Sequence, residues 1–277
     1  MKNSIISSIT IAFRKKSFWI TLFIMIAYVF INYFTALSKM KDWYITDIFS
    51  PSATYALSDS CDLMYYFRQA FPFLIVLPAG FLIISEIRQN VITTFRIREN
   101  NKNYYISKYI SGFLITFCTF FVPFVLSYVI HSITFDFNIY QGVTTTSAPM
   151  FSEYGPYYWG ISMIGFFYKY PTLYNITRIM MVSCFCGVAA CFTMAFADVC
   201  RLKIKIFAFL PVYLVMTLSQ NIAQKVNNEE FNLFNYIPAL GNNRQNYAYF
   251  ALVIFIMIIC IINFTRLSIK RRENYAC

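Results

Sequence analysis

Six apolar runs dominate this sequence and restrict what the chain can fold into. They cover residues of about 17–37, 69–86, 109–130, 176–197, 204–219 and 247–265. A helix needs about 20 apolar residues to cross the hydrocarbon core of a bilayer. The second and fifth runs are shorter, but flanking aromatic residues and the long side chains of Arg68 and Lys205 can extend them to a full span. We therefore expect an all-α membrane protein with six transmembrane helices.

Three of the runs contain a proline in their interior or near one end. Pro78, Pro123 and Pro211 each lack a backbone donor, which a membrane helix tolerates where neighbouring groups satisfy the freed carbonyl. We expect kinks near all three positions.

The distribution of basic residues predicts the orientation of the chain. Most of the 23 Lys and Arg residues lie at the two termini and in the connections after the second and fourth runs. Cytoplasmic loops carry the excess of Lys and Arg, so both termini are expected in the cytoplasm and the chain in the plasma membrane. The external loops are then residues 38–67, 132–174 and 220–246.

The net charge of +11 follows from that orientation. Basic residues beside the spans attract anionic lipid headgroups, so membrane lipid is an expected partner. Nucleic-acid binding would require a basic domain or an aromatic platform away from the membrane, and the sequence offers neither. We expect no nucleic acid among the partners.

Several catalytic classes lack their residues in this chain. The phosphate-binding pattern GxxxxGK[ST] is absent, the single histidine excludes HExxH, and GxSxG is absent too. Cys184, Cys186 and Cys191 cluster without a nearby histidine, and a zinc site requires four ligands at finger-like spacing. We interpret these cysteines as small packing residues and expect a non-catalytic chain with no metal or cofactor of its own.

Ionisable residues lie at the edges of the runs rather than in their middles. Glu86, Arg178 and Asp198 are the examples. Ion-coupled carriers usually keep an ionisable residue or a broken helix at mid-membrane, so this class is disfavoured but stays an alternative. A second alternative is a membrane sensor whose external loops 38–67 and 132–174 bind a ligand without transport.

Residues 1–16 form a basic amphipathic segment in front of the first run. Ile5, Ile9 and Phe13 fall on one helical face, whereas Arg14 and Lys15 fall mostly elsewhere. This pattern predicts an interfacial helix that leads into the first span. The alternative is an ordinary basic membrane anchor.

The connection from Glu86 to Lys108 combines an apolar stripe with a charged end. The stripe recurs at helical spacing in Ile84, Ile87, Val91 and Phe95, and the charged residues that follow are Arg96, Arg98, Glu99 and Lys102. Such a helix end suits docking in a partner's groove, where apolar side chains supply contact area and charges fix the register. The alternative is a basic loop that binds lipid.

On these residues the chain resembles the membrane subunit of an ABC transporter of the type-2 permease family. In that family the second span typically ends in an acidic residue and then a basic or polar one, and an aromatic residue and a lysine open the third span. The residues that match are Glu86, Arg88, Arg98, Tyr104 and Lys108, whereas Asn90 stands where glycine is common. Asn235, Tyr236 and Pro238 resemble the family's external re-entrant segment before the last span.

The resemblance implies that this chain works with partners. These are two copies of a separate cytoplasmic ABC ATPase, which binds ATP and Mg²⁺, and a second membrane subunit, identical or different. Residues 1–16 correspond to the connecting helix and 17–277 to the six-span transmembrane domain. Residues of about 87–103 correspond to the coupling element, with Glu86, Arg88, Phe95, Arg96, Arg98, Glu99 and Lys102 at the ATPase. The implied activity is export of an amphipathic or hydrophobic peptide, lipid-like molecule or drug.

Overall fold

The computed structural model describes residues 2–41, 51–58, 63–88, 101–135, 164–202, 204–238 and 245–273. This part of the chain is helical and contains no strand. Five helices in this part of the chain are long and apolar enough to cross a membrane. If a bent pair of helices is counted as one further span, the number of spans rises to six. The expectation of an all-α, multi-pass membrane protein is thereby confirmed at the level of its helices.

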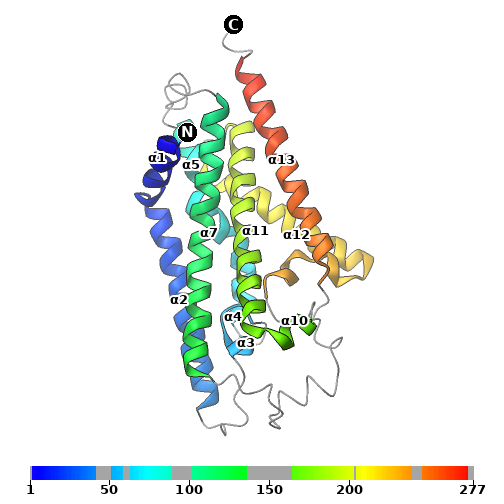
Figure 1. Cartoon of the computed structure of the whole chain (residues 1–277). Coiled ribbons are helices and arrows are strands. Elements are labelled where there is room, and N and C mark those ends of the chain that lie inside the picture. The colour runs from blue at the N-terminus through cyan, green and yellow to red at the C-terminus, as the bar shows by residue number, and fades with distance from the viewer. Residues whose placement is uncertain are drawn as a thin grey trace.

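The helices follow one another as an antiparallel bundle (Figure 1). The membrane-length elements are α2 (Lys16–Met40), the pair α4 (Leu63–Ala79) and α5 (Phe81–Arg88), α7 (Asn101–Thr134), α11 (Pro171–Val199), α12 (Leu210–Val226) and α13 (Tyr247–Glu273). Shorter elements are α1 (Lys2–Phe13), α3 (Pro51–Thr54), α10 (Ile164–Lys169), η3 (Lys205–Phe209), η4 (Glu229–Phe231) and η5 (Leu233–Tyr236). Each apolar run falls on one of these helices or pairs to within one residue. Both termini lie at the same end of the bundle, which we call the terminal end; the opposite end is the distal end.

Helix α11 is the central element of the bundle. In its most apolar 18-residue stretch 72% of the residues are buried, against 17% in α13 and 28% in α2, whose remaining surface suits lipid or another subunit. Close packing of α11 on α7 depends on small residues, as is common between membrane helices. A methyl group at Gly187 would lie 2.5 Å from the Phe113 ring, and one at Gly112 would clash with Met194.

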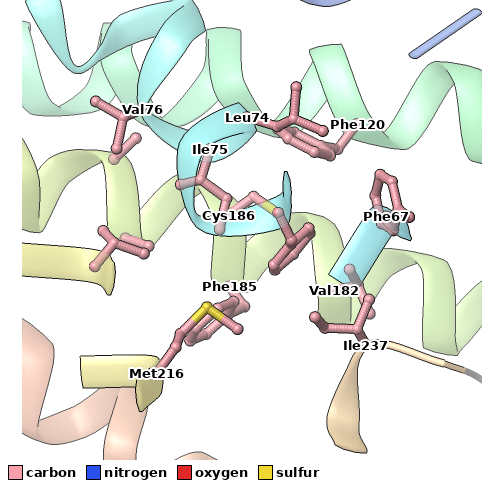
Figure 2. Packing of buried hydrophobic residues seen from close by; sticks show 14 of the residues in the cluster. Phe67, Leu74, Ile75, Val76, Phe120, Val182, Phe185, Cys186, Met216 and Ile237 are labelled. Atoms are coloured by element: carbon pink, nitrogen blue, oxygen red, sulfur yellow. The ribbon is translucent and has the colours of Figure 1, made fainter. Parts of the chain in front are cut away.

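Aromatic and aliphatic side chains from α4, α7, α11 and α12 fill the interior (Figure 2). The rings of Phe71 and Phe185 are stacked with their centroids 6.4 Å apart. Cys186 is fully buried beside Ile75 in this cluster, where its thiol packs as a small apolar group. The Cys186 thiol is therefore surrounded by apolar side chains of the core.

The three prolines affect their helices differently. The axes of α4 and α5 differ by 50° at the break that follows Pro78. Pro123 lies inside α7, which continues through it as one helix. Pro211 lies in the first turn of α12, directly after η3, where its missing donor costs no helical hydrogen bond.

Helix α1 packs against α7 beside the terminal end of the bundle. Ser8 and Ala12 are buried and Ile5 and Ile9 are half-buried, which matches the expected apolar face in part. Phe13 differs from the expectation, because it is 44% exposed and its ring lies edge-on against Phe18 at the start of α2. The chain turns after Phe13 and α2 begins at Lys16, so Phe18 of α2 lies within contact of this ring.

Candidate functional site

A buried ion pair joins α5 to α7 at the terminal end. The Lys108 ammonium lies 2.5 Å from Glu86 Oε1, and the Tyr104 hydroxyl donates to Glu86 Oε2 at 2.5 Å. Tyr104 and Lys108 are four residues apart on α7 and therefore share one face of that helix. All three side chains are buried, so the carboxylate has little water and depends on these two donors.

Lys15 brings a second ammonium group to the same place. It lies in the turn between α1 and α2, and its Nζ donates to Ser85 Oγ at 2.6 Å. The pKa of Lys15 is lowered from 10.5 to about 8, chiefly by burial; Glu86 raises it, and the ammonium groups of Lys108 and Lys205 lower it. Three lysines, Lys15, Lys108 and Lys205, thus lie along α5, which carries Glu86 and leads into residues 89–100.

A second buried carboxylate joins three helices beside this cluster. Asp198, near the end of α11, accepts hydrogen bonds from Tyr105 of α7 at 2.6 Å and from Ser268 of α13. Arg271, one turn further along α13, donates to the Val199 carbonyl at 3.1 Å. The terminal end of α7 is therefore fastened to α5 through Tyr104 and to α11 through Tyr105.

The structure describes only part of the predicted coupling element. Glu86 belongs to the ion pair, Arg88 ends α5 and Lys102 lies in the first turn of α7. Phe95, Arg96, Arg98 and Glu99 lie outside the described residues. Of the residues expected in the interfacial helix, Lys15 reaches the charged cluster, whereas Arg14 is exposed.

Sequence reasoning does not single out Tyr105, Asp198 or Ser268 as partners. Asp198 stands out in the sequence only as an edge residue of its run. The signal in the sequence is that each of these polar side chains lies just outside an apolar run. A polar group that becomes buried at such a position requires a hydrogen-bond partner. Partner identity depends on how the helices pack, which the sequence alone does not reveal.

At the distal end, Arg178 of α11 holds the predicted re-entrant segment. Its Nη2 donates to the Tyr236 carbonyl at 3.2 Å and to the Pro238 carbonyl at 2.7 Å, and its Nη1 donates to Tyr247 at 3.0 Å. Asn235 and Tyr236 are both buried, and Asn235 Nδ2 donates to Glu229. The segment therefore packs into the bundle beside α11 instead of extending from it.

The two ends differ in what they can do chemically. The terminal end combines ionisable groups with several helices and can transmit a displacement between them. The distal end is held by the Arg178 guanidinium, which donates to Tyr236, Pro238 and Tyr247, and by neutral hydrogen bonds such as that of Asn235 to the Glu229 carbonyl. The chain matches no known family model, no curated protein and no solved structure.

Proposed function

We propose that this chain is the membrane subunit of a type-2 ABC exporter, driven by a separate cytoplasmic ATPase. The observation that carries the proposal is the contact of Glu86 with Tyr104 and Lys108. These are three of the five residues on which the resemblance to the family rests, and they meet at the ends of the two spans that flank residues 89–100.

This arrangement suits a coupling element. A force on residues of about 87–103 reaches α5 and α7 directly, because the segment is covalently joined to both helices. The ion pair makes the two helix ends move together, since separating one partner from a buried pair is strongly unfavourable. Tyr105 and Asp198 pass the displacement on to α11 and α13.

We place the substrate path along α2, the α4–α5 pair and α12, between this chain and a second membrane subunit. Only 28% of the apolar stretch of α2 and 33% of that of η3–α12 is buried, so both elements present free apolar surface. A path with aromatic walls suits an amphipathic or hydrophobic peptide, lipid-like molecule or drug. ATP and Mg²⁺ belong to the partner, since the chain lacks a phosphate-binding loop.

The orientation follows from the charged residues at the terminal end. Basic residues lie at or near the ends of α11, η3 and α13 on that side of the bundle; they are Arg201, Lys205, Arg266, Lys270 and Arg271. We infer that this end faces the cytoplasm, because basic residues concentrate there in plasma-membrane proteins. The distal end then faces outward.

Purification from native membranes tests the proposal. When the tagged chain is extracted in mild detergent, we expect a second protein to co-purify with it. This protein should contain GxxxxGK[ST] and hydrolyse ATP. The double reversal Arg96→Glu with Arg98→Glu should release that protein while leaving the thermal unfolding of the tagged chain unchanged. The matched reversal Lys41→Glu with Lys225→Glu, in exposed residues of the distal end, should retain it.

Either of two results contradicts the proposal. One is a purified chain without any ATP-hydrolysing partner. The other is full retention of that partner by the Arg96→Glu and Arg98→Glu variant.

A further inference from the structure

Residues 51–58, which we call the inserted segment, lie inside the bundle although the sequence places them between two spans. They comprise the single turn α3 and the four residues after it. Tyr55, Ala56 and Leu57 are fully buried and belong to the main apolar core. This part of the expected external loop 38–67 is therefore not a solvent-exposed loop.

The inserted segment reaches deep along α2. Tyr28 donates to the Ala56 carbonyl at 2.7 Å, and Asn32 Nδ2 donates to the Thr54 carbonyl at 3.0 Å. Tyr28 lies twelve residues before Met40, the last residue of α2, which is about 18 Å along the helix axis. Irregular backbone at membrane depth is tolerated only where protein covers it or where it lines a water-filled cavity.

Two further helices contribute neutral hydrogen bonds to the inserted segment. Ser127 of α7 accepts from the Ala56 backbone N–H at 3.0 Å. Asn175 of α11 donates to Ser52 Oγ at 2.8 Å. Bonds of this kind exchange readily with water, because water can replace either partner. No charged side chain donates to the segment in any of these contacts.

Several buried polar atoms around the inserted segment have no hydrogen-bond partner within the described part of the chain. Tyr55 OH, Tyr128 OH, Asn175 Oδ1 and Arg178 Nε make no hydrogen bond to any described residue. The rings of Tyr55 and Tyr128 meet edge to face, 5.4 Å apart, so the two hydroxyl groups share one apolar environment. Buried polar groups without a partner raise the free energy of the structure in which the inserted segment lies inside the bundle, relative to a structure in which water reaches these groups.

We propose that the inserted segment is a gate, which leaves its seat among α2, α7 and α11 and opens a water-filled vestibule at the distal end. The walls of the vestibule are Tyr128, Asn175 and Arg178, whose unpaired polar atoms then bind water. Its role as the outward end of a substrate path rests on the proposed export function. Its opening is a property of this chain and does not require that function.

Thiol accessibility tests the gate. Leu57→Cys is the reporter and Leu82→Cys the matched control, since both leucines are at most 1% exposed but Leu82 lies on α5. Each variant, in membranes, is treated with a charged methanethiosulfonate, and labelling at the introduced cysteine is read by peptide mass spectrometry. We expect Leu57→Cys to react at least tenfold faster than Leu82→Cys.

Substitutions at Ser127 and Tyr128, which contact the inserted segment, should change the labelling rate in opposite directions. Ser127→Ala removes the acceptor of the Ala56 N–H and should accelerate labelling of Leu57→Cys severalfold. Tyr128→Phe removes an unpaired hydroxyl from the seat and should slow the labelling severalfold. Equal rates for Leu57→Cys and Leu82→Cys, or no change with either seat variant, would overturn the gate. Labelling in the expected order, with no ATPase co-purifying, would keep the gate and reject the export function.

Discussion

Tyr104 and Tyr105, neighbours in the chain, donate to two different buried carboxylates. Tyr104 binds Glu86 of α5 and Tyr105 binds Asp198 of α11. Successive side chains of a helix point about 100° apart, so a tyrosine doublet can reach two neighbouring helices at one level. The first turns of α7 are thereby fixed between α5 and α11, next to the segment proposed to receive the force of the ATPase.

Tyr105→Phe should destabilise the chain by about 1–3 kcal/mol, because it takes a donor from a buried carboxylate. Asp198 would keep its bond from Ser268. Tyr109→Phe is the matched control, since the Tyr109 hydroxyl shares a bond with Thr265 at a half-buried position and the cost should stay below about 1 kcal/mol. Thermal unfolding in detergent, followed by tryptophan fluorescence, compares the two. Equal losses would show that Tyr105 has no special role.

Breaking the ion pair should cost more than losing a tyrosine. Glu86→Gln leaves the Lys108 ammonium buried without its carboxylate, and we expect a loss of about 3–5 kcal/mol. The double variant Glu86→Leu with Lys108→Met removes both charges together and should recover most of that loss, since apolar replacements of buried pairs are often neutral or stabilising. A double-mutant cycle in unfolding free energy measures the coupling. A coupling energy near zero would mean that the two charges are solvated independently.

The same double variant separates stability from transport. If the pair transmits force, the apolar variant should fold and bind the ATPase, but substrate should no longer stimulate ATP hydrolysis. Hydrolysis rates with and without substrate in reconstituted vesicles provide the measurement. Normal stimulation in the double variant would confine the pair to a structural role.

The helices of this bundle could be predicted from sequence, because each apolar run has the length and composition of a span. The ends of the helices could be predicted less precisely. Helix α7 begins eight residues before the predicted run at Tyr109, since its polar first turns are stabilised by Glu86 and Asp198 rather than by lipid. Helix formation there depends on tertiary contacts that a local apolar pattern does not contain.

The inserted segment was the least predictable part of the described fold. Its sequence Pro-Ser-Ala-Thr-Tyr-Ala-Leu-Ser has the small and polar residues of a surface loop and no helical or strand periodicity. Its burial results from Tyr28, Asn32, Ser127 and Asn175, up to about 120 residues away in sequence. Polar residues inside or directly beside apolar runs are the signal that the sequence offers, and each has several possible partners.

Arg178→Lys should loosen the re-entrant segment without unfolding the bundle. Lysine keeps the charge but offers one compact donor group, so it cannot match the planar guanidinium that binds Tyr236, Pro238 and Tyr247 together. Backbone amides of residues 229–238 should exchange with deuterium at least about tenfold faster, which corresponds to about 1.4 kcal/mol. Arg271→Lys, at the terminal end, is the control and should leave exchange at 229–238 unchanged. Unchanged exchange in Arg178→Lys would show that the segment is held by its apolar contacts alone.

Lys15 should make the stability of the chain depend on alkaline pH. Its pKa is lowered from 10.5 to about 8 in the folded chain, so between these values the unfolded chain binds more protons. The contribution of Lys15 to stability therefore rises as the pH increases from about 8 to 10.5. Below pH 8 the ammonium is charged in both states, and the cost of burying it is present in full. Glu86, Lys108 and Lys205 are the charged groups that face it, and only Glu86 favours the ammonium form.

Lys15→Met isolates this contribution, because the other titrating groups cancel in the comparison with the wild type. The wild type should gain unfolding temperature relative to Lys15→Met between about pH 8 and 10. Competitive labelling with acetic anhydride provides a second measurement, since only the neutral amine reacts: Lys15 should titrate with a midpoint near pH 8 instead of near its ordinary value of 10.5. A midpoint for Lys15 near 10.5, with a temperature difference independent of pH, would place its ammonium in water and away from the Glu86 cluster.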